Sequence, residues 1–310
     1  MRILFLGNFS VPYTSETHHA KSLGELGHQV QCLQETKTTP GQISRASRVA
    51  DLCVWGHTHG WHTHAIEAEF ASALRRGVPV ITYHLDLWHG LHREKDMETD
   101  PYWSVLTDFF TCDRLMADHL NANTKIRGHY LPPGVFGQEC QVVPPTQRFD
   151  VCFVGSKKYH AEWPYRPHLI DWLTQTYGGN FRLYGQDGLG VVRGEELNQV
   201  YANAKVVVGD SLCLGYDYPY YHSDRVPETL GRGGFLIHPR IKGLDELYGD
   251  GKHLVLYTYN DFPELRRLIG YYLRHDEERE AIRRAGHEHV VANHTYVHRW
   301  KHILETLGMS

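Results

Sequence analysis

Residues 221–239 read Tyr-His-Ser-Asp-Arg-Val-Pro-Glu-Thr-Leu-Gly-Arg-Gly-Gly-Phe-Leu-Ile-His-Pro, a polar start followed by closely spaced glycines and an apolar run. Ser223 or Asp224 can serve as the N-cap of a helix. Pro227 is tolerated in the first turn, and the glycines between 231 and 234 end the helix ahead of an apolar strand. The stretch therefore predicts a short helix that leads into a buried strand.

Arg225 and Glu228 are three residues apart on this helix, so both side chains project from one face near its N-terminus. Arg225 and the first N–H groups of the helix can bind phosphate oxygens. Glu228 can accept hydrogen bonds from both hydroxyls of a ribose. The pair suits a nucleoside diphosphate, with Ser223 and Thr229 of the same helix as further contacts. An ordinary surface ion pair on a capped helix is the alternative.

The first half of the chain alternates strands and helices. Strand 2–7, helix 15–27 and strand 29–33 form a βαβ opening, but the loop after the first strand lacks G-x-G-x-x-G, which excludes the usual dinucleotide site. Further strands are predicted at 51–56, 78–83, 109–112 and 126–131, with helices at 63–76 and 113–121. This order predicts a doubly wound parallel sheet.

A second alternation follows residues 132–146, which contain four prolines and form the best interdomain linker. Strands are predicted at 150–155, 181–185, 205–209, 235–238 and 253–257, and helices at 168–177, at 194–203 and from 261 onward. The chain thus predicts two similar α/β halves.

The run S-D-R-V-P-E-T-L-G-R-G-G-F-L-I and the later G-L-D-E-L-Y-G-D-G-K-H-L-V-L-Y resemble the group 1 domain of the CgeB-like GT-B glycosyltransferases, over about residues 150–305. The resemblance implies an α/β GT-B fold, in which two Rossmann-like doubly wound parallel-sheet domains face each other across a cleft. Residues 1–140 would form the acceptor domain and residues 148–292 the nucleotide-sugar donor domain. Residues 293–310 would form a helix that crosses back to the first domain.

The same resemblance places Arg225 and Glu228 on the donor-binding helix. It implies a glycosyltransferase whose co-substrate is a nucleotide sugar, UDP-linked, with no bound cofactor.

Ligands of open α/β sheets bind beyond the carboxyl ends of the strands. In the second half, Gly155, Ser156 and Lys157 follow the first strand, where small residues admit phosphate to the backbone and the lysine supplies charge. Solvated loop lysines are the alternative. Gly185 follows the next strand, where many GT-B enzymes hold the nucleobase, an assignment that rests on fold analogy.

In the first half, Asp86 stands at the carboxyl end of a central strand, where a carboxylate can deprotonate an acceptor hydroxyl. A base on the face opposite the leaving diphosphate inverts the anomeric configuration. An aspartate that caps the following turn is the alternative. Many retaining GT-B transferases carry two glutamates in the donor region, but the position eight before Glu228 is Tyr220, which favours inversion.

Histidines gather in G-H-T-H-G-W-H-T-H at residues 56–64. We expect His57 and His59 to line the cleft or contact the acceptor, and we expect no metal there, because a catalytic zinc site recruits a more distant ligand. His18, at the start of the first helix, can approach the donor from the opposite side, or is an ordinary helix-start residue.

Aromatic residues complete the predicted cleft. Tyr218, in the tyrosine-rich loop 212–222, and Trp88, two residues after Asp86, can stack on a base or sugar or pack between domains.

Composition limits the remaining classes. The net charge of −4 gives no global basic field for nucleic acid. The six cysteines form no C-x-x-C pair, and no apolar run reaches the length of a membrane span. We therefore expect a cytoplasmic enzyme without a membrane span.

The acceptor stays open at this point. Phage DNA glucosyltransferases share the architecture and an Arg-x-x-Glu helix, so a 5-hydroxymethylated base in DNA is one candidate. The basic side chains that could meet a phosphate backbone are Arg45, Arg48, Arg75, Arg76, Lys125 and Arg127. A small molecule, polysaccharide or protein acceptor is the alternative, as are a non-catalytic nucleotide-sugar-binding protein and, more remotely, a metal-dependent hydrolase built on the histidine cluster.

Overall fold

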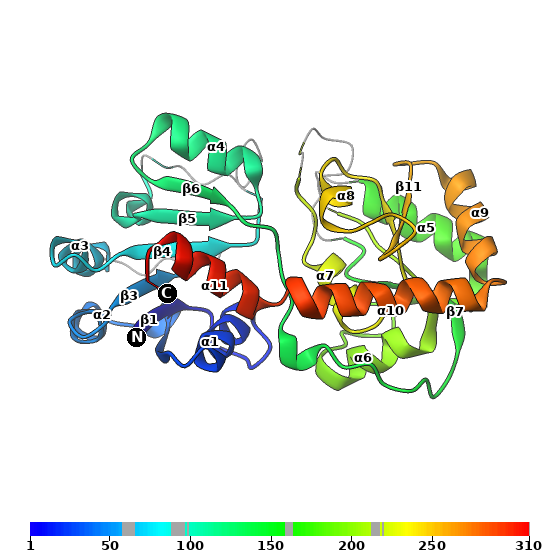
Figure 1. Ribbon diagram of the computed structural model, residues 1–310, viewed down its shortest axis with the longest axis horizontal. Coiled ribbons are helices and arrows are strands. Elements are labelled where there is room, and N and C mark those ends of the chain that lie inside the picture. The colour runs from blue at the N-terminus through cyan, green and yellow to red at the C-terminus, as the bar shows by residue number, and fades with distance from the viewer. Residues whose placement is uncertain are drawn as a thin grey trace. The chain divides into compact units, whose positions relative to one another are not determined.

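The computed structural model describes residues 1–57, 66–87, 97, 99–158, 164–211, 218 and 220–309 (Figure 1). The chain forms two compact units. Unit 1 comprises Met1–Pro132 and Tyr296–Ser310, and unit 2 comprises Pro133–Thr295. Each unit contains its own all-parallel sheet with helices packed on it, so the α/β prediction is confirmed.

The sheet of unit 1 has the order β2-β1-β3-β4-β5-β6. Its strands are β1 (Arg2–Gly7), β2 (Gln29–Gln34), β3 (Leu52–Trp55), β4 (Val80–His84), β5 (Asp108–Thr111) and β6 (Arg127–Tyr130). The inner strands β3, β4 and β5 are buried along their whole length, as expected of parallel strands covered on both faces. Every strand predicted in this half is present.

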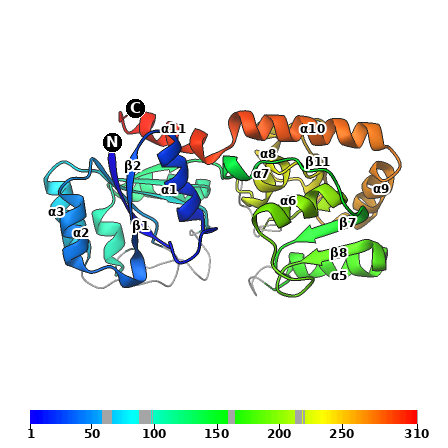
Figure 2. The same cartoon turned by 90° about the horizontal axis from the view of Figure 1, so that it is seen from below.

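The helices of unit 1 are α1 (Ser15–Glu25), α2 (Pro40–Ser47), α3 (Glu67–Arg75), α4 (Arg114–Asn123) and α11 (Tyr296–Thr306), with short 3₁₀ turns at η1 (Glu35–Lys37) and η2 (Pro101–Val105). The last helix, α11, lies beside α1 (Figures 1 and 2). Trp300 of α11 is fully buried and donates its indole N–H to His19 Nδ1 at 3.2 Å. The C-terminal segment is therefore part of the core of unit 1.

The sheet of unit 2 has the order β11-β10-β9-β7-β8. Its strands are β7 (Phe149–Val154), β8 (Phe181–Tyr184), β9 (Ala204–Val208), β10 (Leu236–Pro239) and β11 (Val255–Tyr257). Its helices are α5 (Tyr165–Tyr177), α6 (Gly194–Asn203), α7 (Arg225–Gly231), α8 (Leu244–Leu247), α9 (Phe262–Tyr272) and α10 (Asp276–Asn293), with η3 (Gly137–Glu139) and η4 (Gly178–Asn180). The predicted helix and strand after residue 221 are thus α7 and β10.

Both sheets reverse their winding direction at one point. In unit 1 the chain moves from β1 to β2 on one side and returns to β3 on the other, and in unit 2 it moves from β7 to β8 and returns to β9. The loops that leave the two strands at such a switch point diverge, which opens a place for a ligand at the edge where the strands end. We call this edge the carboxyl edge and the opposite one the amino edge.

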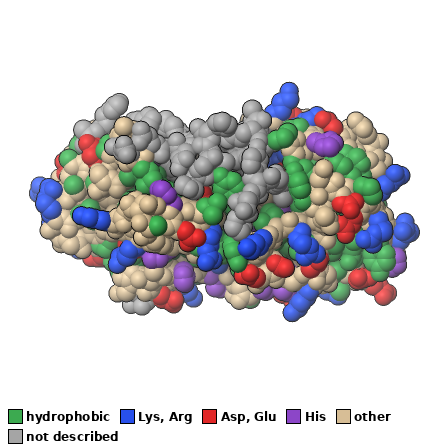
Figure 3. Space-filling view, turned by 90° about the horizontal axis from the view of Figure 1, so that it is seen from above, with side chains coloured by type: hydrophobic (Ala, Val, Ile, Leu, Met, Phe, Trp, Pro, Cys, Tyr) green, Lys and Arg blue, Asp and Glu red, His purple; other side chains and the backbone are tan. Residues whose placement is uncertain are grey.

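The described helices lack a long apolar segment, and the described surface carries charges of both signs, as the composition predicts. None of the described helices is long and apolar enough to cross a bilayer. On the face drawn in Figure 3, acidic and basic side chains are interspersed.

Candidate active site

At the switch point of unit 2, the loops after β7 and β8 approach so closely that they need glycine. Gly155 and Gly185 have φ values of +151° and +153°, which L side chains rarely adopt. The Gly155 N–H donates to Tyr184 O at 2.7 Å. A Cβ built on Gly185 would lie 2.4 Å from Gly155 O. The two glycines predicted for the donor site therefore lie together.

Lys157, in the loop after β7, is held by carboxylates. Its backbone N–H donates to Asp187 Oδ2 at 2.9 Å, and its ammonium group pairs with Asp171. These contacts fix the loop but neutralise much of the charge that the sequence assigns to a phosphate. Its phosphate contact stays a prediction.

A buried ion pair that the sequence does not indicate joins the first turn of α5 to the loop after β9. Arg166 Nε lies 2.8 Å from Asp210 Oδ2, and the two side chains are 13% and 4% exposed. Arg166 also donates from Nη1 to Ser156 O at 3.3 Å. The sequence offered a signal for only one member of this pair: Asp210 follows the strand V-V-V closely, just as Asp86 follows its own strand. No local signal marks Arg166.

The start of α7 is fixed by hydroxyl groups. Ser211 Oγ accepts from the Ser223 N–H at 3.1 Å and lies 3.4 Å from His238 Nε2. Ser223 Oγ in turn accepts from the Arg225 N–H at 3.2 Å. Asp224 occupies the N-cap position without a side-chain cap bond, so Ser223 supplies the hydroxyl that the sequence predicted.

Arg225 and Glu228 are paired as their spacing predicts. Arg225 Nη1 lies 2.6 Å from Glu228 Oε2, and the side chains are 27% and 22% exposed, so both reach the surface. Burial alone would lower the pKa of Arg225, but the Glu228 carboxylate outweighs it and the pKa is raised. Arg232 Nε stands 3.8 Å from the other Glu228 oxygen. The carboxylate is therefore held between two guanidinium groups.

Thr229, also predicted at the donor site, is fully buried, and its hydroxyl donates to Tyr201 OH at 3.3 Å. It supports α7 from within the core, which leaves its side chain no exposed surface for a ligand.

In unit 1, Asp86 lies two residues beyond the end of β4, at the carboxyl edge and next to β3 in the sheet. Its side chain is half-buried, and its N–H donates to His84 Nδ1 at 3.2 Å. This is the position that the sequence predicts; its role as a base stays a prediction. His18 lies on α1, half-buried, after the loop that follows β1.

His57, predicted to contact the acceptor, is buried at 2% exposure. Its Nδ1 lies 2.9 Å from Glu35 Oε1 and its Nε2 lies 3.0 Å from Asp100 Oδ2. Trp55 donates to the same Glu35 oxygen at 2.8 Å. The ring therefore ties η1 and the residue before η2 to the end of β3, an internal role that burial favours over acceptor contact.

The remaining predicted contacts are only partly visible. Tyr218 is half-buried, whereas His59 and Trp88 lie outside the described residues. Within the described residues, no group of three or more His, Cys, Asp or Glu side chains could hold a metal ion. The rest of the histidine cluster also lies outside those residues.

Comparisons with known proteins show which proteins this chain resembles. Residues 162–305 match the family model described as Glycosyl transferase-like. A search of curated protein sequences finds no significant match.

Solved structures resemble the whole chain. HepE from Anabaena in complex with UDP and glucose has a TM-score of 0.68 at 14% identity, with 100% of both chains covered. An alpha-glucosyltransferase in complex with UDP-glucose and DNA containing an abasic site has a TM-score of 0.75 at 9% identity, with 99% of both chains covered. Sucrose-phosphate synthase from Thermosynechococcus elongatus has a TM-score of 0.62 at 12% identity, with 99% of both chains covered.

The two parallel-sheet units and these likenesses define a GT-B fold. The match over residues 162–305 adds the class of enzyme, and the chain is a glycosyltransferase. The matched segment contains α7 with Arg225 and Glu228.

Proposed function

We propose that the enzyme transfers a sugar from a UDP-linked donor to an acceptor hydroxyl and holds the donor at the carboxyl edge of unit 2. The observation that carries the proposal is the partly exposed Arg225–Glu228 pair at the start of α7, in a segment that matches a glycosyl transferase-like model. The UDP in the HepE complex and the UDP-glucose in the alpha-glucosyltransferase complex support a UDP-linked donor.

Each group has a distinct task in this proposal. The Arg225 guanidinium binds diphosphate oxygens, for which its planar fork is suited. Glu228, which two arginines hold in place, accepts from the ribose hydroxyls. The backbone at Gly155 and Ser156 approaches the phosphates, since no Cβ projects from Gly155, and Gly185 lies toward the nucleobase.

Binding of UDP to paired variants tests the donor site. Arg225→Ala and Glu228→Gln each remove a charge-assisted contact, so we expect the Kd for UDP to rise about tenfold to a hundredfold. Asp276→Asn is a matched control, because Asp276 also pairs with an arginine three residues away at 2.6 Å, on α10. Calorimetry that finds the same Kd for Arg225→Ala, Glu228→Gln and wild type would exclude this donor site.

For the chemical step we propose Asp86 as the base. A carboxylate that removes the acceptor proton on the face opposite the departing diphosphate inverts the anomeric carbon. Tyr220, at the position where many retaining relatives place a glutamate, supports inversion. The anomeric configuration of the product, determined by NMR before mutarotation, tests this directly, and retention would rule the mechanism out.

A 5-hydroxymethylated base in phage-type DNA is the acceptor that we propose to test first, because one similar structure holds both UDP-glucose and DNA. The test is transfer to hydroxymethylated duplex DNA, with unmodified duplex as the control. Transfer to neither duplex would remove DNA as the acceptor.

The basic side chains that motivated this acceptor lie at the amino edge of unit 1. Arg45 and Arg75 are in the last turns of α2 and α3, Arg48 and Arg76 directly follow these helices, and Lys125 and Arg127 are at the start of β6. Helices that connect parallel strands run back along the sheet, so their C-termini lie at the amino edge.

Arg127 is further engaged by Asp108 through bonds of 2.8 and 2.7 Å. Asp86 lies at the opposite edge, so this cluster does not surround the proposed base. The placement favours the second candidate, a small molecule, polysaccharide or protein, whose transfer would depend only weakly on salt.

A further inference from the structure

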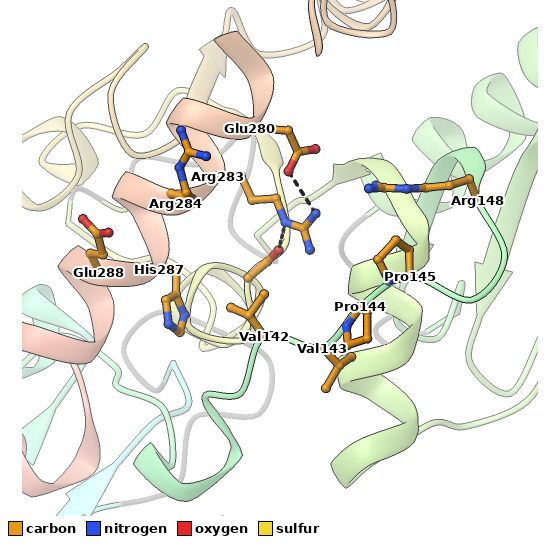
Figure 4. Close-up of a pocket in the computed structure, with 11 residues that line it drawn as sticks. Val142, Val143, Pro144, Pro145, Arg148, Glu280, Arg283, Arg284, His287 and Glu288 are labelled. Atoms are coloured by element: carbon orange, nitrogen blue, oxygen red, sulfur yellow. Dashed lines mark hydrogen bonds and ion pairs between the residues drawn. The ribbon is translucent and has the colours of Figure 1, made fainter. Parts of the chain in front are cut away.

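Unit 2 contains a cavity of about 390 Å³ between α10 and the segment that leads into β7 (Figure 4). Val142, Val143, Pro144 and Pro145 form an apolar wall on one side, which we call the strap, and residues 280–288 of α10 lie on the other. Arg148 directly precedes β7, and Gly233, also in the lining, precedes β10. The cavity is therefore at the amino edge, whereas Arg225 is at the carboxyl edge.

Three arginines line this cavity: Arg148, Arg283 and Arg284. Arg148 and Arg284 are exposed, and within the described part of the chain neither forms a hydrogen bond or an ion pair. In Figure 4 the Arg148 side chain extends from the end of the strap toward α10. Two guanidinium groups are thus available to an incoming anion.

Arg283 is the buried member of the set, with a side chain that is 9% exposed. Its Nε donates to Gly233 O and its Nη1 lies 3.3 Å from Glu280 Oε2, while Nη2 bonds to no described residue. Burial lowers the pKa of Arg283, and Arg148 adds to this against the opposing effect of Glu280. The cavity therefore carries more positive than negative charge, since three guanidinium groups face the two carboxylates of Glu280 and Glu288.

We propose that this cavity binds a small organic phosphate, with its phosphate between the three guanidinium groups and its remaining atoms against the strap. Guanidinium groups bind phosphate through two parallel N–H bonds, and the three guanidinium groups outnumber the two carboxylates of the lining, which favours an anion. The volume of about 390 Å³ exceeds what phosphate alone needs and falls in the range of ligand pockets. The apolar wall offers packing surface for the organic part.

Calorimetric titration of the full chain with glucose 6-phosphate tests the proposal, with glucose as the uncharged probe and inorganic phosphate as the probe without an organic part. We expect glucose 6-phosphate to bind most tightly. Arg148→Ala should weaken it about tenfold and the double variant with Arg284→Ala further. Both side chains are exposed, so these variants are expected to fold. Arg267→Ala, on the surface of α9, is the matched control and should bind like wild type.

Four outcomes would overturn the proposal. The first is no binding of glucose 6-phosphate, and the second is binding that persists in the Arg148→Ala, Arg284→Ala double variant. The third is loss in Arg225→Ala with retention in Arg148→Ala, which would place the phosphate at the proposed donor site. The fourth is equal affinity for inorganic phosphate, which would remove the organic part of the assignment. Since Arg225→Ala is scored separately, failure here leaves the donor site untouched.

Discussion

Replacing Gly185 with alanine should damage unit 2 more than a backbone conformation alone can explain. Gly185 has a φ of +153°, which costs an L residue about 1–3 kcal/mol. The new Cβ would also stand 2.4 Å from Gly155 O, so one loop must move by roughly 1 Å to restore an ordinary contact. The Gly155 loop cannot retreat freely, because its N–H is bonded to Tyr184 O at 2.7 Å.

The overlap adds roughly 1–3 kcal/mol to the conformational cost, as overpacking does elsewhere. The total is about 2–6 kcal/mol, and a loss of about 4 kcal/mol in a unit of this size lowers Tm by roughly 8–16 °C. Gly190→Ala separates the two causes, because Gly190 has a φ of +105° but its Cβ would meet nothing within 4 Å. It should lose only the conformational part, about 1–3 kcal/mol.

Differential scanning calorimetry of wild type and of three glycine variants measures these losses. Gly179→Ala is the second control, since its Cβ would also meet nothing within 4 Å and its φ is not positive. We expect Tm to fall in the order Gly179→Ala, Gly190→Ala, Gly185→Ala, and we expect only Gly185→Ala to bind UDP more weakly below its transition. If Gly185→Ala were no less stable than Gly190→Ala, the close approach of the two loops would be refuted.

Three further predictions concern single side chains. Asp86→Asn should slow transfer about 10²–10⁴-fold with an unchanged Kd for UDP; transfer at the wild-type rate would remove Asp86 as the base. Burial holds the pKa of His19 at about 3, so unfolding takes up a proton below the ordinary pKa of 6.5 and stability should fall as pH drops from 6.5 toward 3, with a slope approaching ~1.4 kcal/mol per pH unit. His19→Gln should lack this slope in acid denaturation series. Burial alone would raise the pKa of Asp108, but hydrogen bonds from a histidine and an arginine of β6 outweigh it and the pKa is lowered. Its stabilisation should therefore be present at neutral pH and disappear as pH falls through the lowered value, so urea titrations of wild type and Asp108→Asn should converge in acid and diverge at pH 7.

Strands such as β1, β3 and β9 could be predicted because each is largely an apolar run that ends at or before a glycine. Helix α6 spans Gly194–Asn203, the range that the sequence predicts. Helix α2 escaped prediction, because Pro40 and Gly41 are typical turn residues. The structure shows a capping box between Thr39 and Gln42 with Pro40 at the first helical position. The sequence Thr-Pro-Gly-Gln therefore contained a helix-start signal.

In the candidate site, contacts between residues close in sequence could be predicted, whereas contacts between distant residues could not. Arg225 and Glu228 are one helical turn apart, and spacing alone predicts their contact. Arg166 and Asp210 are 44 residues apart, and only the adjacency of β7 and β9 brings them together. His57 shows the same dependence on distant residues, since its ring nitrogens meet carboxylates 22 and 43 residues away. Clustering of histidines in sequence therefore says little about what each one contacts.

The two edges of the unit 2 sheet show why a sequence can indicate one binding place and conceal another. At the carboxyl edge, turns follow each strand directly. The glycines and short polar runs of these turns therefore reveal the carboxyl edge in the amino-acid sequence. At the amino edge, the cavity is assembled from Arg148, in the approach to β7, and Arg283, within a long helix near the end of the chain. Each reads alone as a solvated surface arginine. Only the fold brings them together, and only there do three guanidinium groups around one cavity indicate an anion as the ligand.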